Sequence, residues 1–252
     1  MNKPIIGSHI IELKQTASTN VYTDKLLHSE KPAEGTVIIA YKQTNGKGQD
    51  QNAWESEANK NLTFSIILYP VFLNPSEQFR LIEVASLGIT DFIKPLLSTD
   101  QEIKIKWPND IYIGDRKLCG TLVQNSIVGA NLTECIIGVG LNVNQVKFLS
   151  DAPNPVSLTQ ITGVSYNLHQ CLAELCACID NRYHQLKNKH YSLLETDYLS
   201  ILYRFNELHD FIIHDNKVHA RITGITNFGQ LKLESSDHKN YECGMKEVVY
   251  CL

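Results

Sequence analysis

Apolar residues follow two different spacings along the first two-thirds of the chain. Short apolar runs typical of strands alternate with longer helical patterns, and these runs occupy 38–41, 62–68, 103–107 and 135–143. One helical pattern opens at Ser76 and continues to Leu96, where Pro95 should bend or end the helix. A second helical region covers about 167–205. This alternation predicts a domain built from both strands and helices.

The pattern changes near residue 207. Turn-forming residues such as Asp215-Asn216 and Gly229 now separate short apolar runs, which occupy 211–213, 218–222, 231–233 and 248–250. We therefore expect two domains, 1–206 and 207–252, of which the second is a small all-β unit of barrel type.

Composition and charge exclude several classes of protein. The 252 residues are 43% hydrophobic and 20% charged, which is typical of a folded globular protein. A net charge of −4 gives no electrostatic reason to expect a nucleic acid or a membrane as partner. The most apolar stretch, 62–73, is too short to span a bilayer, and the N-terminus lacks the layout of a signal peptide. We expect a cytoplasmic protein.

The seven cysteines favour reduced thiols over a disulfide framework or a metal site. Their number is odd, and the sequence contains neither C-x-x-C nor H-E-x-x-H. Cys176 lies on the apolar stripe of a helical pattern and is expected in the core. No structural metal is predicted.

A long polar segment, 43–61, separates two predicted strands. Gly46 and Gly48 would let backbone N–H groups approach an anion, and Lys47 adds positive charge. A mobile surface loop that uses glycines for turning explains the same residues. The sequence has no Walker motif, so this is not an ordinary phosphate-binding loop.

A second segment whose residues could take part in catalysis is Lys106-Trp107-Pro108-Asn109-Asp110. It leads through a predicted hairpin, with Gly114-Asp115 at the turn, to Lys117 and Gly120. Ammonium groups here could neutralise the charge that develops during attack on phosphorus. The alternative is structural, because Pro-Asn-Asp forms turns readily and Lys117 could point to solvent.

Two further segments have both a structural and a functional interpretation. Gly138 to Asn144 resembles a dinucleotide fingerprint only superficially, since the third glycine and the following helix are missing. Its glycines could instead allow close backbone packing in a strand. Ser18-Thr19-Asn20 precedes a short helical run and could cap it, or could bind a small polar ring.

The order and spacing of these segments resembles that of the biotin–protein ligases, which activate biotin with ATP and attach it to a lysine of a carrier protein. Ser-Thr-Asn comes first, then Gln43 and a loop whose Gly46, Trp54 and Ser56 are in register with the family's G-R-G-R-x-G-R-x-W-x-S. K-W-P-N-D and the G-x-G-[IL]-N strand follow in order. The resemblance implies an α+β fold: a mixed-sheet catalytic domain of the biotin/lipoate ligase type, similar to class II synthetases, with a C-terminal SH3-like β-barrel.

The resemblance also implies roles for individual residues. The biotin site would consist of Ser18, Thr19, Asn20, Gln43, Lys47, Gly48, Gln49 and Lys117. The nucleotide site would consist of Gly46, Trp54, Asn109, Asp110 and Asn142. Lys117 would be catalytic, because it would contact the biotin carboxylate and its phosphoanhydride. No covalent enzyme intermediate is implied.

The same resemblance predicts substrates and partners. ATP with Mg²⁺ and biotin would be the substrates, and a biotin carrier domain of a biotin-dependent carboxylase would be the acceptor. Neither nucleic acid nor membrane is expected, and the protein would be a monomer or a weak homodimer. The chain starts almost at Ser18, which suggests the ligase-only type without an N-terminal DNA-binding domain.

The loop departs from the family pattern. Lys47, Gln49, Gln51 and Asn52 stand where the family has Arg, Arg, Gly and Arg, and segment 43–61 carries two lysines against three acidic residues. Such a loop should hold an anionic adenylate less firmly. We therefore expect the intermediate to leak more readily, and we expect the loop to become ordered on ligand binding.

Three alternatives stay open. A lipoate ligase or octanoyltransferase shares the general fold, although K-W-P-N-D and Ser-Thr-Asn argue against it. A non-catalytic biotin sensor would bind the ligand without ATP turnover. A DNA-binding repressor is disfavoured by the net charge.

Overall fold

The structure is a computed structural model and describes residues 3–49, 52–150 and 152–251.

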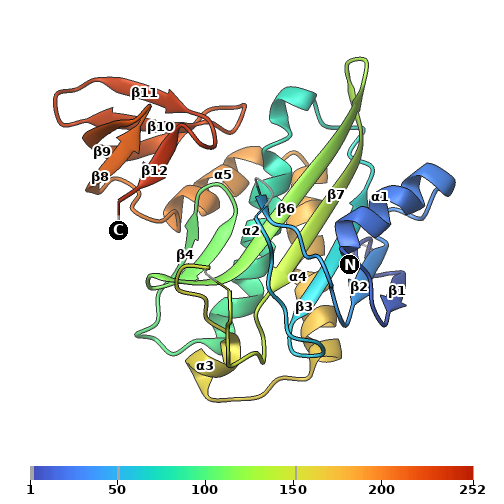
Figure 1. The fold of residues 1–252 in the computed structure, drawn as a ribbon. Coiled ribbons are helices and arrows are strands. Elements are labelled where there is room, and N and C mark those ends of the chain that lie inside the picture. Colours follow the sequence, from blue (N-terminus) through green and yellow to red (C-terminus); the bar gives the residue numbers. More distant parts are fainter. Residues whose placement is uncertain (1–2, 50–51, 151, 252) are drawn as a thin grey trace.

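The first sheet has seven strands, some parallel and some antiparallel. The strands are β1 (Ile10–Leu13), β2 (Val37–Ala40), β3 (Leu62–Leu68), β4 (Ile103–Lys106), β5 (Asp110–Ile113), β6 (Arg116–Val128) and β7 (Asn131–Leu141). Their order is β1-β2-β3-β7-β6-β5-β4, in which β1 and β2 are parallel and all other neighbours antiparallel (Figure 1).

Most of the predicted strands are confirmed. The run 62–68 coincides with β3, in which every residue is buried, and the hairpin turns at Gly114, whose φ of 56° suits glycine. β1 was not predicted, because it has four residues that are at most half-buried at the edge of the sheet. β6 and β7 are longer than expected, since their outer ends form a projecting hairpin without a continuous apolar run.

The helices pack on this sheet. The main ones are α1 (Thr19–Ser29), α2 (Arg80–Ile93), α4 (Leu168–Lys187) and α5 (Tyr191–Ser200), with a short α3 (Leu158–Thr162). Figure 1 shows α2 and α4 behind the sheet, whereas the chain that follows β2 crosses its front. α2 and α4 approach closely at Gly88, where a Cβ would come within 2.6 Å of Ile179 Cα.

Two helix boundaries differ from the sequence expectation. The pattern from Ser76 to Leu96 is one α-helix between two 3-10 turns, η2 (Pro75–Glu77) and η3 (Lys94–Leu96), and Pro95 lies in the second turn. The helical region expected to reach about residue 205 ends at Ser200 instead. The chain beyond it pairs with β4, because Ile105 N–H donates to Ile201 O at 2.9 Å and Tyr203 N–H donates to Ile105 O at 2.8 Å.

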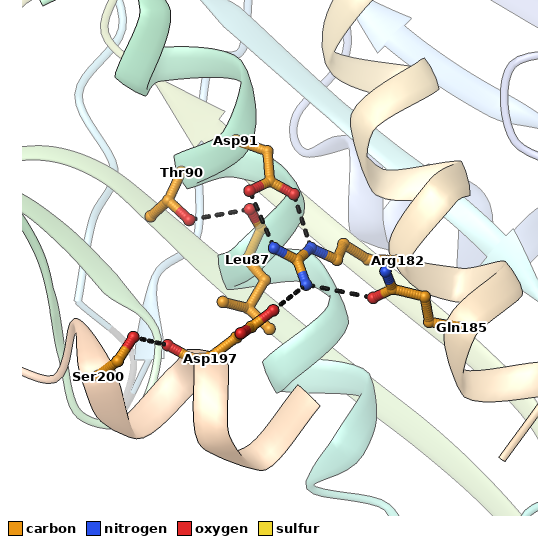
Figure 2. A network of polar contacts seen from close by, with 7 residues as sticks. All are labelled: Leu87, Thr90, Asp91, Arg182, Gln185, Asp197 and Ser200. Carbon is orange, nitrogen blue, oxygen red and sulfur yellow. Dashed lines mark hydrogen bonds and ion pairs between the residues drawn. The ribbon is translucent and has the colours of Figure 1, made fainter. Parts of the chain in front are cut away.

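One arginine joins the three helices behind the sheet (Figure 2). Arg182 on α4 donates to both carboxylate oxygens of Asp91 on α2, at 2.6 and 3.0 Å, and also to Asp197 on α5. A guanidinium bound in this way fixes geometry as well as charge. The arrangement holds α2, α4 and α5 as a support for the sheet.

The second sheet is antiparallel throughout. It contains β8 (Leu208–Ile213), β9 (Asn216–Ile225), β10 (Leu231–Ser235), β11 (Asn240–Cys243) and β12 (Val248–Tyr250), in the order β11-β10-β9-β8-β12. One contact between the two sheets joins their turns: the indole N–H of Trp107, between β4 and β5, donates to Gly229 O, between β9 and β10, at 3.0 Å. The predicted α+β class is confirmed. None of the helices in the described ranges has the length and apolar character needed to cross a membrane.

Candidate active site

A cavity of about 190 Å³ lies where the start of α1 meets β6, β7 and the loop after β2. All eight residues expected to bind biotin line it: Ser18, Thr19, Asn20, Gln43, Lys47, Gly48, Gln49 and Lys117. These residues come from segments up to about one hundred positions apart. We call this space the first cavity.

The polar wall of the first cavity is fixed by hydrogen bonds. Ser18 occupies the N-cap position of α1, yet its side chain makes no capping bond. The first helical N–H, that of Thr19, instead donates to Gln43 Oε1 at 2.8 Å. Asn20 accepts from Ser65 Oγ at 2.6 Å and donates to Gln124 Oε1 at 3.0 Å. The side chains at this helix start therefore do not serve as caps, and Gln43 does.

Glycines form the floor of the first cavity. A Cβ at Gly138 would overlap the amide of Asn20, and one at Gly140 would overlap the ring of Trp54. Gly120 on β6 lies directly opposite Gly140 on β7 and also faces Trp54. The glycines thus let two large side chains lie directly on the strands, so the close approach at the G-x-G segment is made by side chains and not, as expected, by backbone.

A second, larger cavity of about 520 Å³ adjoins the first. The two share Asn52, Ala53, Trp54, Asp110 and Lys117. Of the expected nucleotide residues, Trp54, Asp110 and Asn142 line it. The indole N–H of Trp54 and Oδ1 of Asn142 are buried without a hydrogen-bond partner among the described residues, so each could serve a ligand.

Two expected nucleotide residues lie behind the cavity walls. Gly46 O accepts from Trp54 N–H at 2.9 Å, and a Cβ at Gly46 would come within 2.5 Å of Trp54 O. The side chain of Asn109 is buried and donates to the Thr121 carbonyl on β6. Neither residue is among those that line the first or the second cavity in the described part of the chain. Their direct contact with a nucleotide stays a prediction.

Two lysines line the second cavity, and one of them, Lys117, also lines the first. Lys117 Nζ lies 2.6 Å from Asp110 Oδ2 and 5.7 Å from the centre of the Trp54 ring. Lys106 lines the second cavity, with its Nζ 5.2 Å from the Tyr112 ring and 4.9 Å from the Tyr250 ring. Burial lowers the pKa of Lys106, although Asp110 works in the opposite direction. Both lysines face a space that could receive an anion.

Sequence reasoning missed several residues of the second cavity. Lys106 lies in the K-W-P-N-D segment but was not assigned to the site, and its motif could have indicated it. The other missed residues are Ala53, Glu55, Tyr112, Phe148, Ser150, Ala152, Pro153 and Pro155. Residues 148–150 and 152–155 carry no recognisable motif, so only the folded chain places members of both stretches at the second cavity.

The loop 43–61 is described apart from residues 50 and 51, so the departure at Gln51 lies outside the described residues. Lys47, Gln49 and Asn52, the other three departures, line the first cavity. The loop is closed by Gly48 N–H, which donates to Asn52 O at 2.7 Å. Within the same described ranges, no group of three or more His, Cys, Asp or Glu residues could hold a metal ion.

The chain is similar to a family of biotin and lipoate ligases and to several individual biotin ligases. A profile of the Biotin/lipoate A/B protein ligase family matches residues 12–142. The bifunctional ligase/repressor BirA of Bacillus spizizenii is 30% identical over 185 residues, which are 71% of this chain and 55% of that protein. The biotin–[acetyl-CoA-carboxylase] ligase of Mycobacterium tuberculosis is 28% identical over 69% of this chain and 64% of that protein. The chain thus spans little more than half the length of the Bacillus relative.

A solved structure shows the same fold. The biotin protein ligase from Aquifex aeolicus, in complex with biotin and ATP, matches with a TM-score of 0.77 over 96% of this chain and 98% of that one, at 23% identity. The likeness confirms the predicted architecture of a mixed-sheet domain of the ligase type followed by a small SH3-like β unit.

Proposed function

The chain belongs to the Biotin/lipoate A/B protein ligase family, and from this premise we propose that it is a biotin–protein ligase. It activates biotin with ATP to form biotinyl-5′-AMP and pyrophosphate. It then transfers the biotinyl group to a lysine of a biotin carrier domain, releasing AMP. The acceptor we propose is the carrier domain of a biotin-dependent carboxylase, in line with the name of the Mycobacterium tuberculosis relative.

The observation that carries the proposal is the junction of the two cavities. A polar, hydrogen-bonded first cavity suits the biotin ring, and a larger second cavity with the aromatic residues Tyr112 and Phe148 suits a nucleotide. Lys117, Asp110 and Trp54 belong to both. A carboxylate at the end of the first cavity would therefore meet the α-phosphate at Lys117.

Lys117 fits the proposed chemistry of both steps. In the first, a biotin carboxylate oxygen attacks the α-phosphorus and pyrophosphate leaves; in the second, the lysine amine attacks the anhydride carbonyl and AMP leaves. The ammonium of Lys117 neutralises charge on the reacting oxygens, and Asp110 at 2.6 Å holds it in position. Most of the acceleration comes from positioning and charge.

The remaining expected residues take supporting roles in the proposal. Ser18, Thr19, Asn20 and Gln43 bind the polar ring of biotin, and loop residues Lys47, Gly48 and Gln49 cover it. Asp110 is the carboxylate best placed to approach a Mg²⁺ ion carried by the triphosphate, since such an ion needs few protein ligands. Gly46 shapes the loop beside Trp54, and Asn109 anchors the hairpin behind Asp110.

The domain division at residue 207 belongs to the same proposal. The five strands of the second sheet lie between Leu208 and Tyr250, in support of domains at 1–206 and 207–252. Tyr250 of β12 packs against Lys106 at the second cavity. The small domain therefore supports the nucleotide side of the proposed site.

The test is ATP- and biotin-dependent labelling of a carrier domain. Lys117→Ala should lower the labelling rate at least about 100-fold, as expected when a preorganised charge is removed from a transition state. Lys60→Ala, an exposed lysine of the loop, is the matched control and should retain the wild-type rate. Biotin binding without labelling would indicate a non-catalytic sensor, and labelling only with lipoate would indicate a lipoate ligase.

A further inference from the structure

The outer side of the second cavity is formed by irregular chain rather than by a strand or helix. Phe148 and Ser150 line the cavity, and Leu149 between them is 89% exposed. We call residues 146–150 the outer segment. Its position depends on hydrogen bonds from other parts of the chain, because it belongs to no strand or helix whose backbone hydrogen bonds would hold it.

Glu55 makes an unusual set of contacts with the outer segment. The N–H of Leu149 donates to Oε1 and Oε2 at 2.9 and 3.0 Å, and the N–H of Ser150 donates to Oε2 at 2.8 Å. Gln145 Nε2 also donates to Oε1, at 3.0 Å. A carboxylate that accepts consecutive backbone N–H groups fixes the turn between them.

Gln145 is buried next to this contact and hydrogen-bonds to both the loop and the outer segment. It is 1% exposed, and its Oε1 accepts from Glu57 N–H at 2.9 Å and from Asn61 Nδ2 at 2.6 Å. Its Nε2 donates to Lys147 O at 2.8 Å as well as to Glu55. The loop 43–61 and the outer segment are therefore joined through two side chains, about 90 residues apart in sequence.

The charge of Glu55 is maintained by its surroundings. Burial works to raise the pKa of its carboxyl group, but hydrogen bonds from Ser150, Leu149 and Gln145 outweigh it, and the pKa is lowered. Its contribution is therefore present above the ordinary glutamate range and lost only as the pH falls through the lowered value. At neutral pH the contact is charge-assisted.

We propose that Glu55 is a positioning residue for the nucleotide, because it holds the backbone of Leu149 and Ser150 beside Phe148 at the second cavity. It thereby ties this wall to the loop that carries Trp54. This inference rests on the proposed ligase function. The loop itself keeps other anchors, such as Trp54 N–H to Gly46 O and Asn59 N–H to Tyr41 O. Gln145 and Gln160 hold the start of the outer segment, through the carbonyls of Lys147 and Val146. Loss of Glu55 should therefore loosen its end, at Leu149 and Ser150, and leave the first cavity intact.

The test compares Glu55→Gln with Glu57→Gln in the full chain. Both remove one carboxylate from the same loop. Glu57 is exposed, however, and among the described residues its side chain makes no hydrogen bond to the outer segment, since only its backbone N–H contacts Gln145. Glu55→Gln places an amide NH₂ against backbone N–H groups. It should raise the Kd of a non-hydrolysable ATP analogue and the KM for ATP about tenfold, as for the loss of a charge-assisted hydrogen bond. Biotin affinity and kcat should stay within about twofold.

The outcomes separate the two proposals. An unchanged Kd for the ATP analogue in Glu55→Gln, or an equal loss of biotin affinity, would overturn the positioning role. A shift confined to the nucleotide, with Glu57→Gln like the wild type, would support it. A wild-type protein that binds the ATP analogue but does not label a carrier would refute the ligase function. The ratio of the analogue Kd in Glu55→Gln to that in the wild type would still decide the role of Glu55.

Discussion

The two adjoining cavities are built in different ways. The first is covered by the loop after β2, but its polar wall and floor are regular structure, where the start of α1 and strands β6 and β7 hold polar side chains through hydrogen bonds. The second has an outer wall of irregular chain, which Glu55 and Gln145 attach to the 43–61 loop. Sites on strands and helices keep their geometry more exactly than sites on loops.

The difference implies a division of tasks between the cavities. A preformed cavity loses little conformational entropy on binding and can discriminate polar groups of a small ring by their hydrogen bonds. A wall held by a few side-chain contacts can move to admit a larger ligand and release it. We expect the first cavity to determine the choice of acid, and the second to control nucleotide entry and pyrophosphate release.

The largest effect should come from filling the floor of the first cavity. Gly138→Ala places a Cβ on the Asn20 amide and breaks its bonds to Ser65 and Gln124. Biotin affinity should fall by about two orders of magnitude, since overpacking and lost hydrogen bonds add. Calorimetric titration with biotin measures this, and binding of an ATP analogue should change little.

Gly244→Ala is the control for that substitution, because its Cβ would meet only Glu247, at 3.4 Å. It should bind biotin like the wild type. Equal losses for biotin and the ATP analogue in Gly138→Ala would show that the two cavities are not independent.

A smaller effect should follow from restoring an arginine to the loop. Gln49 lines the first cavity, and a guanidinium there could form a charge-assisted hydrogen bond with the adenylate phosphate. Gln49→Arg should slow release of biotinyl-5′-AMP about tenfold. The measurement is the adenylate off-rate by rapid filtration, with Lys60→Arg as the exposed control. A wild-type off-rate as slow as that of an enzyme with an arginine-rich loop would contradict the leakage hypothesis.

The smallest effect on binding is expected from a site outside both cavities. Glu83 on α2 is 5% exposed, and its Oε2 has no hydrogen-bond partner among the described residues, although Arg80 lies 3.6 Å away. Burial raises the pKa of Glu83 to about 7, against the opposing effect of Arg80. The folded state then retains a proton that the unfolded state loses near pH 4.5. Stability should therefore fall as the pH rises from about 4.5 to about 7.

Glu83→Gln removes this titration. It should raise the free energy of unfolding by about 3 kcal/mol at pH 8 and have almost no effect at pH 4. Urea unfolding at the two pH values measures the difference, and ligand affinities serve as the control for both cavities. An equal change in the free energy of unfolding at both pH values would show that the charge of the Glu83 carboxylate does not cause the loss of stability.

The sequence predicted most of the elements and the biotin-binding residues of the first cavity. Continuous apolar runs marked β3 and β7, and the Gly114-Asp115 turn marked the hairpin, because periodicity and turn chemistry are local properties. The eight expected biotin residues were found through motifs, and the structure brings all of them to one cavity. The sequence did not distinguish between helix capping and ligand binding at Ser18, since both need the same polar groups.

Local patterns in the sequence were enough to identify the chemically capable residues and the elements in which they lie. The folded chain was needed to show that Gly120 pairs with Gly140 on the neighbouring strand, that Gln43 caps α1, and that Glu55 holds Leu149 and Ser150. Strand register and contacts between distant loops depend on how the whole core packs. No local spacing encodes them, so the second cavity emerges only in the folded chain.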